Sequence, residues 1–209
     1  MGVPVLILGE SGSGKSASLR NFEADEIGVF NVAGKPLPFR KKLQSCSTAD
    51  YGKIMGIIRK STKKVFVIDD SQYLMCFENF AKAKDTGYGK YTDMALNFYN
   101  LVQFVIQQTA DDVIVYFLHH TETDSNTGKV KAKTMGKMLD NQLTLEGLFS
   151  IVLNCVTDGK KHSFITQSDG YTTCKSPMEM FPLEIENDLK MVDQTIRDYY
   201  EMNEKENEQ

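Results

Sequence analysis

VPVLILGESGSGKS, residues 3–16, is the stretch of sequence that decides the fold. Its first half, Val3 to Leu8, has the apolar composition of a strand buried on both faces. Its second half matches the phosphate-loop spacing G-x-x-x-x-G-K-[ST] and ends in Lys15-Ser16. Glycine reaches positive φ at little cost, so backbone N–H groups can surround an anion while the next helix points its positive end there. The stretch therefore predicts a nucleotide-phosphate site.

The residue types in this loop predict the roles of its members. Lys15 is expected to reach the β- and γ-phosphates, and the Ser16 hydroxyl to bind Mg²⁺. The other expected nucleotide-binding residues are Gly9, Ser11, Gly12, Ser13, Gly14 and Ala17. ATP and Mg²⁺ are thus the expected ligands. The alternative is a loop that merely turns the chain, but Leu19 and Phe22, three residues apart in a helix-forming stretch, favour the strand–loop–helix context of the motif.

Length and composition predict a single domain over residues 1–202, followed by a polar tail at 203–209 that we expect to be disordered. A net charge of −4 argues against a globally basic nucleic-acid binder but leaves room for a local basic patch. No apolar run approaches the ~18 residues of a membrane span, and no signal peptide is visible, so we expect no membrane association and a cytoplasmic location.

The four cysteines, at positions 46, 76, 155 and 174, form no C-x-x-C pair. We expect them to be small buried apolar residues rather than a disulfide or zinc framework.

A second informative stretch is Val65 to Ile68, an apolar run that ends in the carboxylates Asp69 and Asp70. Ligands of parallel sheets bind at the carboxyl ends of the strands, so an acid there faces the phosphates. Carboxylates suit a hard cation such as Mg²⁺. Asp69 is the expected metal partner, acting through water, with Asp70 beside it; an ordinary strand and turn is the alternative.

The apolar run from Val113 to Leu118 predicts another strand of the same sheet, and it delivers His119-His120-Thr121-Glu122 to the edge where the phosphate loop lies. Adjacent residues of a strand point to opposite faces, so at most one histidine can face the nucleotide. We expect His120 or Thr121 to sense the γ-phosphate. The alternative, with equal weight, is that both histidines bond neighbouring loops.

Two stretches are candidates for contact with single-stranded DNA. Lys129, Lys131, Lys133 and Lys137 concentrate positive charge in an otherwise acidic chain, and the first three alternate along one side of an extended loop. The linker around Lys84 and Lys90, which carries Tyr88 and Tyr91, could stack bases. A plain solvated hairpin and a loop with tyrosines folded onto the core are the respective alternatives.

The remaining pattern predicts an α/β fold with a mainly parallel, twisted sheet and helices on both faces. The expected further elements are strands at 27–32, 148–156 and 162–167, a second antiparallel hairpin entering 171–177, and helices at 51–60, 72–84, 91–109 and 187–201. Antiparallel hairpin strands are therefore expected at the C-terminal end of the sheet.

This order of motifs resembles the RecA-like branch of the P-loop NTPases. The phosphate loop with the stretches 67–74, 117–122 and 175–177 is similar to small P-loop (RecA-like or AAA-type) ATP-binding proteins of tailed-bacteriophage replication and recombination modules. The resemblance implies a Mg²⁺-dependent ATPase that binds single-stranded DNA and assists single-strand annealing or replication in the host cytoplasm. It also implies a ring or filament of identical chains, with phage recombination or replication proteins as possible partners.

Carried over to this chain, the resemblance implies catalytic roles for Lys15 and for Lys175, which falls where related ring ATPases offer a basic finger to the neighbouring nucleotide. This chain departs from the family in one respect. Such enzymes place a catalytic Glu just after their second strand, but residues 27–38 of this chain contain no acid. Water activation would then fall to Glu10, Asp70 or Glu122, and hydrolysis could be slow.

Two other functions compete with this one. A nucleotide-gated interaction module, such as a helicase loader, would use ATP only to set a conformation. A small nucleotide kinase is less favoured, because such kinases clamp two phosphorylated substrates with lid arginines and this chain has only Arg20, Arg40, Arg59 and Arg197.

Overall fold

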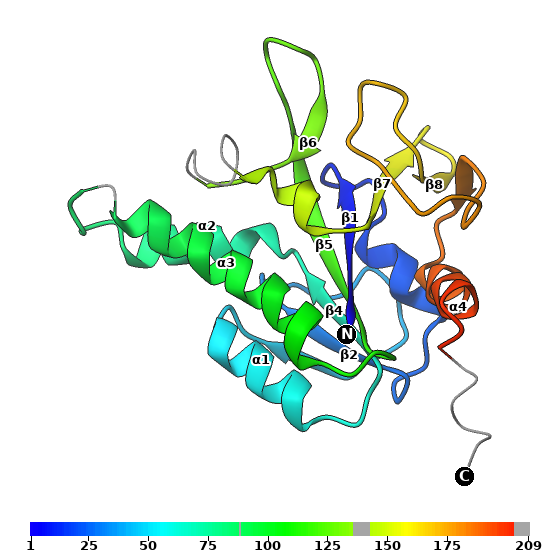
Figure 1. Ribbon diagram of the computed structural model, residues 1–209, viewed down its shortest axis with the longest axis horizontal. Coiled ribbons are helices and arrows are strands. Elements are labelled where there is room, and N and C mark those ends of the chain that lie inside the picture. The colour runs from blue at the N-terminus through cyan, green and yellow to red at the C-terminus, as the bar shows by residue number, and fades with distance from the viewer. Residues whose placement is uncertain (88, 136–142, 203–209) are drawn as a thin grey trace.

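The computed structural model describes residues 1–87, 89–135 and 143–202. It is an α/β fold in which a mixed, mostly parallel sheet lies between two layers of helices (Figure 1). Tyr88, Lys137 and the tail at 203–209 lie outside the described residues, so the predictions made for them are not addressed. Among the described residues, no helix combines the length and apolar character needed to cross a membrane.

The sheet runs in the order β3-β2-β4-β5-β1-β7-β8-β9, and β6 pairs with β5 outside this path. Its strands are β1 (Val3–Gly9), β2 (Ile27–Asn31), β3 (Ser45–Ser47), β4 (Val65–Asp69), β5 (Ile114–Thr123), β6 (Val130–Ala132), β7 (Ile151–Thr157), β8 (His162–Ile165) and β9 (Glu184–Glu186). Neighbouring strands from β3 to β7 are parallel, whereas β6, β8 and β9 are antiparallel to their partners. The mainly parallel sheet that the apolar runs predict is confirmed.

Helices cover both faces of the sheet, as expected. They are η1 (Ser16–Asn21), α1 (Tyr51–Lys60), α2 (Gln72–Ala81), α3 (Gly89–Gln108), η3 (Leu145–Leu148) and α4 (Leu189–Tyr199). Figure 1 shows α1, α2 and α3 gathered on one side of the sheet, with η1 and α4 on the other. Alternate residues of β1 pack against the two helix layers. Leu6 and Leu8 belong to the apolar cluster under α1 and α3, whereas Val5 and Ile7 belong to the cluster under η1 and α4.

The strand register brings the polar ends of three strands together. Gly9 lies opposite His120 in the β1–β5 pair, and Asn31 lies opposite Asp69 in the β2–β4 pair. Since β5 separates β1 from β4, the end of β5 lies between the phosphate loop and the acidic pair that begins at Asp69. The sheet thus assembles one polar edge from residues far apart in the sequence.

Three local predictions were wrong or incomplete. The helix after the phosphate loop is a short 3₁₀ helix, and the polar strand β3 was not anticipated. The hairpin β7–β8 is confirmed, but 171–177 contributes only isolated bridges, at Thr172 with Val130 and at Lys175 with Val152. The edge strand beside β8 is instead β9. The backbone of β9 pairs with the free edge of β8, whose N–H and C=O groups need hydrogen-bond partners.

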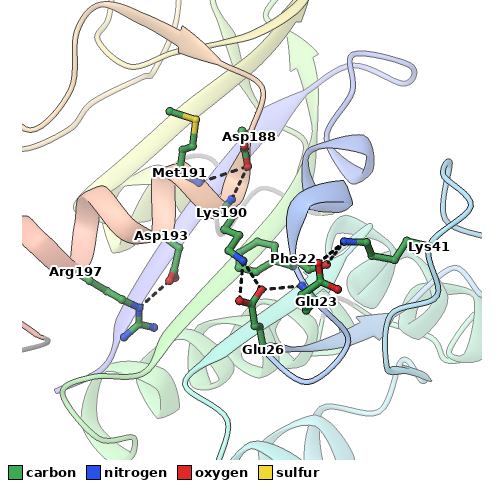
Figure 2. A network of polar contacts seen from close by, with 9 residues as sticks. All are labelled: Phe22, Glu23, Glu26, Lys41, Asp188, Lys190, Met191, Asp193 and Arg197. Carbon is green, nitrogen blue, oxygen red and sulfur yellow. Dashed lines mark hydrogen bonds and ion pairs between the residues drawn. The ribbon is translucent and has the colours of Figure 1, made fainter. Parts of the chain in front are cut away.

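The closing helix α4 is fixed to the layer of η1 by polar contacts (Figure 2). Asp188 caps its start by accepting from the N–H groups of Lys190 and Met191, and the Lys190 ammonium bonds both oxygens of Glu26. At the other end, Arg197 bonds Asp193 at 2.7 Å. Asp193 also accepts from the hydroxyl of Tyr116 on β5 at 2.9 Å, so α4 is tied to the centre of the sheet as well as to the loop before β2.

Candidate nucleotide site

A cleft of about 470 Å³ opens at the polar edge of the sheet. One wall is the phosphate loop with the start of η1, and the opposite wall is the segment after β2 that contains Lys35. Asp69, Asp70 and His120 lie along the same cleft. The sequence predicts most of these residues, and the fold brings them to one place.

Lys15 is buried and folded back over its own loop. Its ammonium donates to the carbonyl oxygens of Gly9 and Glu10, each at 2.8 Å. Burial lowers the pKa of this ammonium from its ordinary value. An ammonium has three donors, so the two loop carbonyls fix its position and leave one N–H for a ligand in the cleft that Lys15 lines.

Ser16 and Asp69 meet across the cleft floor. The Ser16 hydroxyl donates to Asp69 Oδ1 at 2.7 Å, although 53 positions separate the two residues. Burial raises the pKa of the Asp69 carboxyl, while the bond from Ser16 acts in the opposite direction. A hydroxyl beside a carboxylate provides two oxygens of the kind that Mg²⁺ prefers. In the described part of the chain, no three His, Cys, Asp or Glu side chains converge as a metal centre, so a cation here would also need water and phosphate oxygens.

The backbone of the loop fits a phosphate group. Gly12 and Gly14 have φ of +82° and +105°, the region that side chains disfavour. Within the described residues, the N–H groups of Gly12, Gly14 and Lys15 make no hydrogen bond to the protein, and the buried Ser13 hydroxyl is unpaired. A buried hydroxyl is costly to leave unbonded, and unpaired N–H groups that gather at one loop suit an anion that accepts several donors at once. The residues present therefore fit a bound polyphosphate with Mg²⁺.

Asp70 lies at the centre of a charged cluster beside the loop. It accepts from His120 Nε2 and from the Lys35 ammonium, both at 3.0 Å. Although burial acts to raise it, these two bonds hold the pKa of Asp70 below its ordinary value. Asp70 has φ of +59°, a strained value for a residue other than glycine. The turn directs Asp70 toward His120 and Lys35 while Asp69 bonds Ser16, so two adjacent acids serve different partners.

The two adjacent histidines face opposite sides of β5, as the strand period predicts. His119 is fully buried and bonds Ser71 through Nδ1 at 2.9 Å and the Lys133 carbonyl through Nε2 at 2.8 Å. The carbonyl can only accept, so Nε2 carries the proton and Nδ1 accepts from the Ser71 hydroxyl. Burial lowers the pKa of His119 to about 4. Thus His119 bonds neighbouring segments, whereas His120 lines the cleft.

Sequence reasoning missed a second set of residues beneath the phosphate loop. His162 Nδ1 lies 2.7 Å from the Ser13 carbonyl, and Cys155 Sγ donates to the same oxygen at 3.0 Å. Asn187 bonds both the Gly14 carbonyl and Cys155 Sγ. These contacts brace the loop from the C-terminal strands. No motif could reveal them, because they depend on the packing of segments more than 140 positions apart.

Other predicted catalytic residues lie elsewhere. Glu10 and Thr121 line an adjacent cleft of about 280 Å³ that shares Ser11 with the first. Glu122 is not among the residues lining either cleft, and it pairs with Lys131 at 3.4 Å. Lys175 forms a backbone bridge with Val152 on β7 and also lines neither cleft. Of the acids predicted to activate water, the structure brings Asp70 into the main cleft.

The lysine-rich segment forms a hairpin with the end of β5. β6 pairs antiparallel to β5, so Lys131 lies opposite Glu122, and the Lys133 N–H donates to the His120 carbonyl. Lys129 and Lys133 are exposed, whereas Lys131 is half-buried beside Glu122. In Figure 1 this hairpin extends beyond the carboxyl edge of the sheet. This hairpin geometry is compatible with both sequence interpretations, a contact with DNA and a solvated loop, and does not distinguish them.

Comparison of the sequence with family models and with curated proteins finds no match to either.

Proposed function

We propose that this chain is a RecA-like P-loop ATPase of the kind found in phage replication and recombination modules, which binds ATP with Mg²⁺ and acts on single-stranded DNA. The observation that carries the proposal is the Ser16–Asp69 hydrogen bond of 2.7 Å next to the buried Lys15. A glycine-rich turn without a nucleotide role would not need a lysine held over the loop and a hydroxyl aligned with a buried acid on another strand.

The chain's own residues divide the work of such a site. Free N–H groups of the loop and the Lys15 ammonium would bind the phosphates, and Ser16 and Asp69 would hold Mg²⁺ directly and through water. Bound Mg²⁺ supplies charge neutralisation on the phosphate oxygens. Asp70 and His120, bonded to each other at 3.0 Å, are two groups of the cleft that could orient water or accept a proton from it.

Single-stranded DNA is the proposed partner because the exposed Lys129 and Lys133 lie on a hairpin continuous with the nucleotide edge. The Lys133 N–H bonds the carbonyl of His120, and the Lys133 carbonyl bonds His119, so the hairpin base is joined to the strand that carries the candidate sensor. A ring or filament of chains in the host cytoplasm, with Lys175 reaching a neighbour, belongs to the same proposal and follows from the resemblance alone.

A nucleotide-gated binding module is the second candidate, and one observation favours it. Asp70, the acid of the main cleft that is predicted to activate water, is already engaged by His120 and Lys35. A carboxylate held by two cationic or polar partners is a weaker base than a free one. Slow hydrolysis with tight ATP binding would follow from this arrangement.

A nucleotide kinase is disfavoured by the positions of the arginines. Arg20 bonds Asn187, Arg59 bonds Gln108, and Arg197 bonds Asp193. These three guanidinium groups hold elements of the fold together. They are not among the residues lining the candidate nucleotide cleft, where a kinase needs cations for two phosphorylated substrates.

The decisive experiment measures phosphate release from ATP with Mg²⁺, with and without single-stranded DNA. DNA-stimulated release supports the ATPase proposal. ATP binding without turnover, indifferent to DNA, supports the gated module. Transfer of phosphate to a nucleoside monophosphate would replace both with a kinase. Failure to bind ATP at millimolar concentration in calorimetry would contradict all three.

A further inference from the structure

Lys35 occupies a defined place on the wall of the cleft opposite the phosphate loop. It follows β2, whose last residue, Asn31, lies beside Asp69 in the parallel register. The Asn31 amide is buried and bonds the Lys35 backbone twice, by donating to its carbonyl and by accepting from its N–H at 3.2 Å. Gly34, with φ of +67°, allows the tight turn between them. The backbone of Lys35 is therefore fixed relative to the acidic strand β4.

The side chain of Lys35 is held as well. Its ammonium lies 3.0 Å from Asp70 Oδ2 and 5.0 Å from the centre of the Tyr73 ring. Tyr73 also packs edge-on against His120, with 5.6 Å between ring centres. One carboxylate and one aromatic face thus aim the cation into the cleft that both Lys35 and the phosphate loop line. An ammonium offers three donors, so a bond to Asp70 leaves others available.

We propose that Lys35 is a second phosphate-binding cation of this site, which contacts the terminal phosphate of a nucleoside triphosphate and so distinguishes it from a diphosphate. The inference rests on the proposed nucleotide function. Lys15 is bonded to the base of the loop, at Gly9 and Glu10, and lies on the loop side of the cleft. Lys35 approaches from the opposite wall, next to Asp70 and His120, where the end of a phosphate chain directed away from the loop would lie.

The neighbouring lysines show why this position is unusual. Lys41, in the same segment, pairs with Glu23 at 2.7 Å, and Lys42 is exposed and forms no ion pair within the described residues. Neither is among the residues lining the main cleft. Lys35 alone of these three combines a clamped backbone, a directed ammonium and a place on the cleft wall. Lys42 therefore offers a matched control for the loss of one positive charge.

The test is calorimetric binding of a non-hydrolysable ATP analogue and of ADP, each with Mg²⁺, to the wild type and to Lys35→Met, Lys35→Arg and Lys42→Met. Lys35→Met should lose roughly tenfold to a hundredfold in affinity for the ATP analogue, the range of one charge-assisted hydrogen bond, and change ADP affinity less than about threefold. Lys35→Arg should keep most of the affinity, and Lys42→Met should match the wild type. Thermal melts should show that all variants fold, because the Lys35 side chain is 60% exposed.

Three other outcomes for the variants overturn the inference, and the wild type together with Lys15→Ala tests the proposed function separately. Equal losses for the ATP analogue and ADP in Lys35→Met would remove the terminal-phosphate contact, as would no loss at all. An equal loss in Lys42→Met would assign the effect to general charge. If the wild type bound neither nucleotide, the proposed function would fail together with the inference. If the wild type bound both nucleotides and Lys15→Ala abolished binding, the proposed nucleotide function would be supported. The Lys35 variants would then test the role of Lys35 alone.

Discussion

The two faces of β5 at its carboxyl end place the same residue type in opposite environments. His119, under α3, is fully buried, packs edge-on against Phe98 and has a polar partner at each ring nitrogen. His120, one residue later, is partly exposed in the cleft and bonds an acid that also binds Lys35. One histidine completes a closed hydrogen-bond set, and the other belongs to a cluster that faces solvent.

This difference shows how a single strand can serve stability and chemistry together. The closed face joins Ser71, just after the acidic pair, to Lys133 at the base of the lysine-rich hairpin. The open face keeps charged groups at a cleft that fits phosphate. We therefore expect substitutions on the open side to affect ligands more than folding, and substitutions on the closed side to affect folding first.

The largest effect is expected on the open side, from Lys15→Ala. The change removes the loop's ammonium and also its two bonds to the Gly9 and Glu10 carbonyls. ATP affinity should fall about a thousandfold, roughly 4 kcal/mol, because the charge-assisted contact of the ammonium to phosphate and the two bonds that fix the ammonium over the loop are lost together. Calorimetry with Mg²⁺ measures it, with Lys42→Ala as the charge control. Unchanged affinity in Lys15→Ala would end the phosphate-loop interpretation.

On the closed side, we expect stability to depend on pH through His119. Its pKa is about 4 in the folded protein against an ordinary 6.5, so between these values the unfolded chain binds more protons than the folded one. The free energy of unfolding should therefore decrease as the pH falls from about 6.5 to 4, by about 3 kcal/mol from this residue.

Urea unfolding at several pH values checks this prediction. His119→Gln has no titrating group at this position, so its stability should change less across the same window than that of the wild type. Both proteins should be measured at the same ionic strength, because screening alters the contributions of other groups. Identical pH dependence in the two proteins would show that His119 does not control it.

The site was only partly predictable from the sequence. The phosphate loop, Asp69 and the opposite orientation of the two histidines follow from local spacing and strand period, which act over a few residues. Lys35 and His162 reach the site through sheet register and packing of distant segments, which no local pattern encodes.

The fold, too, was predictable in its long buried strands and unpredictable in its short edge strands. Long apolar strands such as β1 and β4 are recognisable because burial on both faces requires them to be apolar throughout. The edge strands β3 and β9 are three residues long with exposed ends, and backbone pairing alone defines them. Their composition carries no strand signal, so β3 was missed and the strand beside β8 was placed in the wrong segment.

A smaller effect on the open side is expected from Asp69→Asn. The amide keeps the shape and can still bond Ser16, but it lacks the charge that holds a hydrated cation. ATP should remain bound, while its Mg²⁺ dependence and any turnover are lost, an effect of about 2 kcal/mol on cation binding. Titration of Mg²⁺ in the presence of a fixed ATP concentration measures this. Full activity would transfer the metal role to Asp70.

The lysine-rich hairpin formed by β6 and the end of β5 allows a test of DNA binding. Changing Lys129, Lys131 and Lys133 to Glu should weaken binding of single-stranded DNA about tenfold or more and flatten its salt dependence, because each lost phosphate contact removes counterion release. Lys131 already pairs with Glu122, so the exposed Lys129 and Lys133 should account for most of the change. Labelled DNA in a salt series with ATP measures both quantities. A variant that matches the wild type in affinity and slope would leave the linker near Tyr91 as the DNA candidate.

The smallest effect, and the most direct comparison with His119, is expected from His120→Gln. A glutamine amide can still donate to Asp70, and the histidine is partly exposed, so the free energy of unfolding at neutral pH should change by less than about 1 kcal/mol. His119→Gln at the same pH should cost about 2 kcal/mol more, because it disturbs a fully buried set of bonds to Ser71 and Lys133. Urea unfolding of the two variants side by side measures the difference. Equal losses would mean that the cluster of Asp70, Lys35 and His120 also holds the fold together, and the division between a structural and a ligand-facing side of β5 would then be wrong.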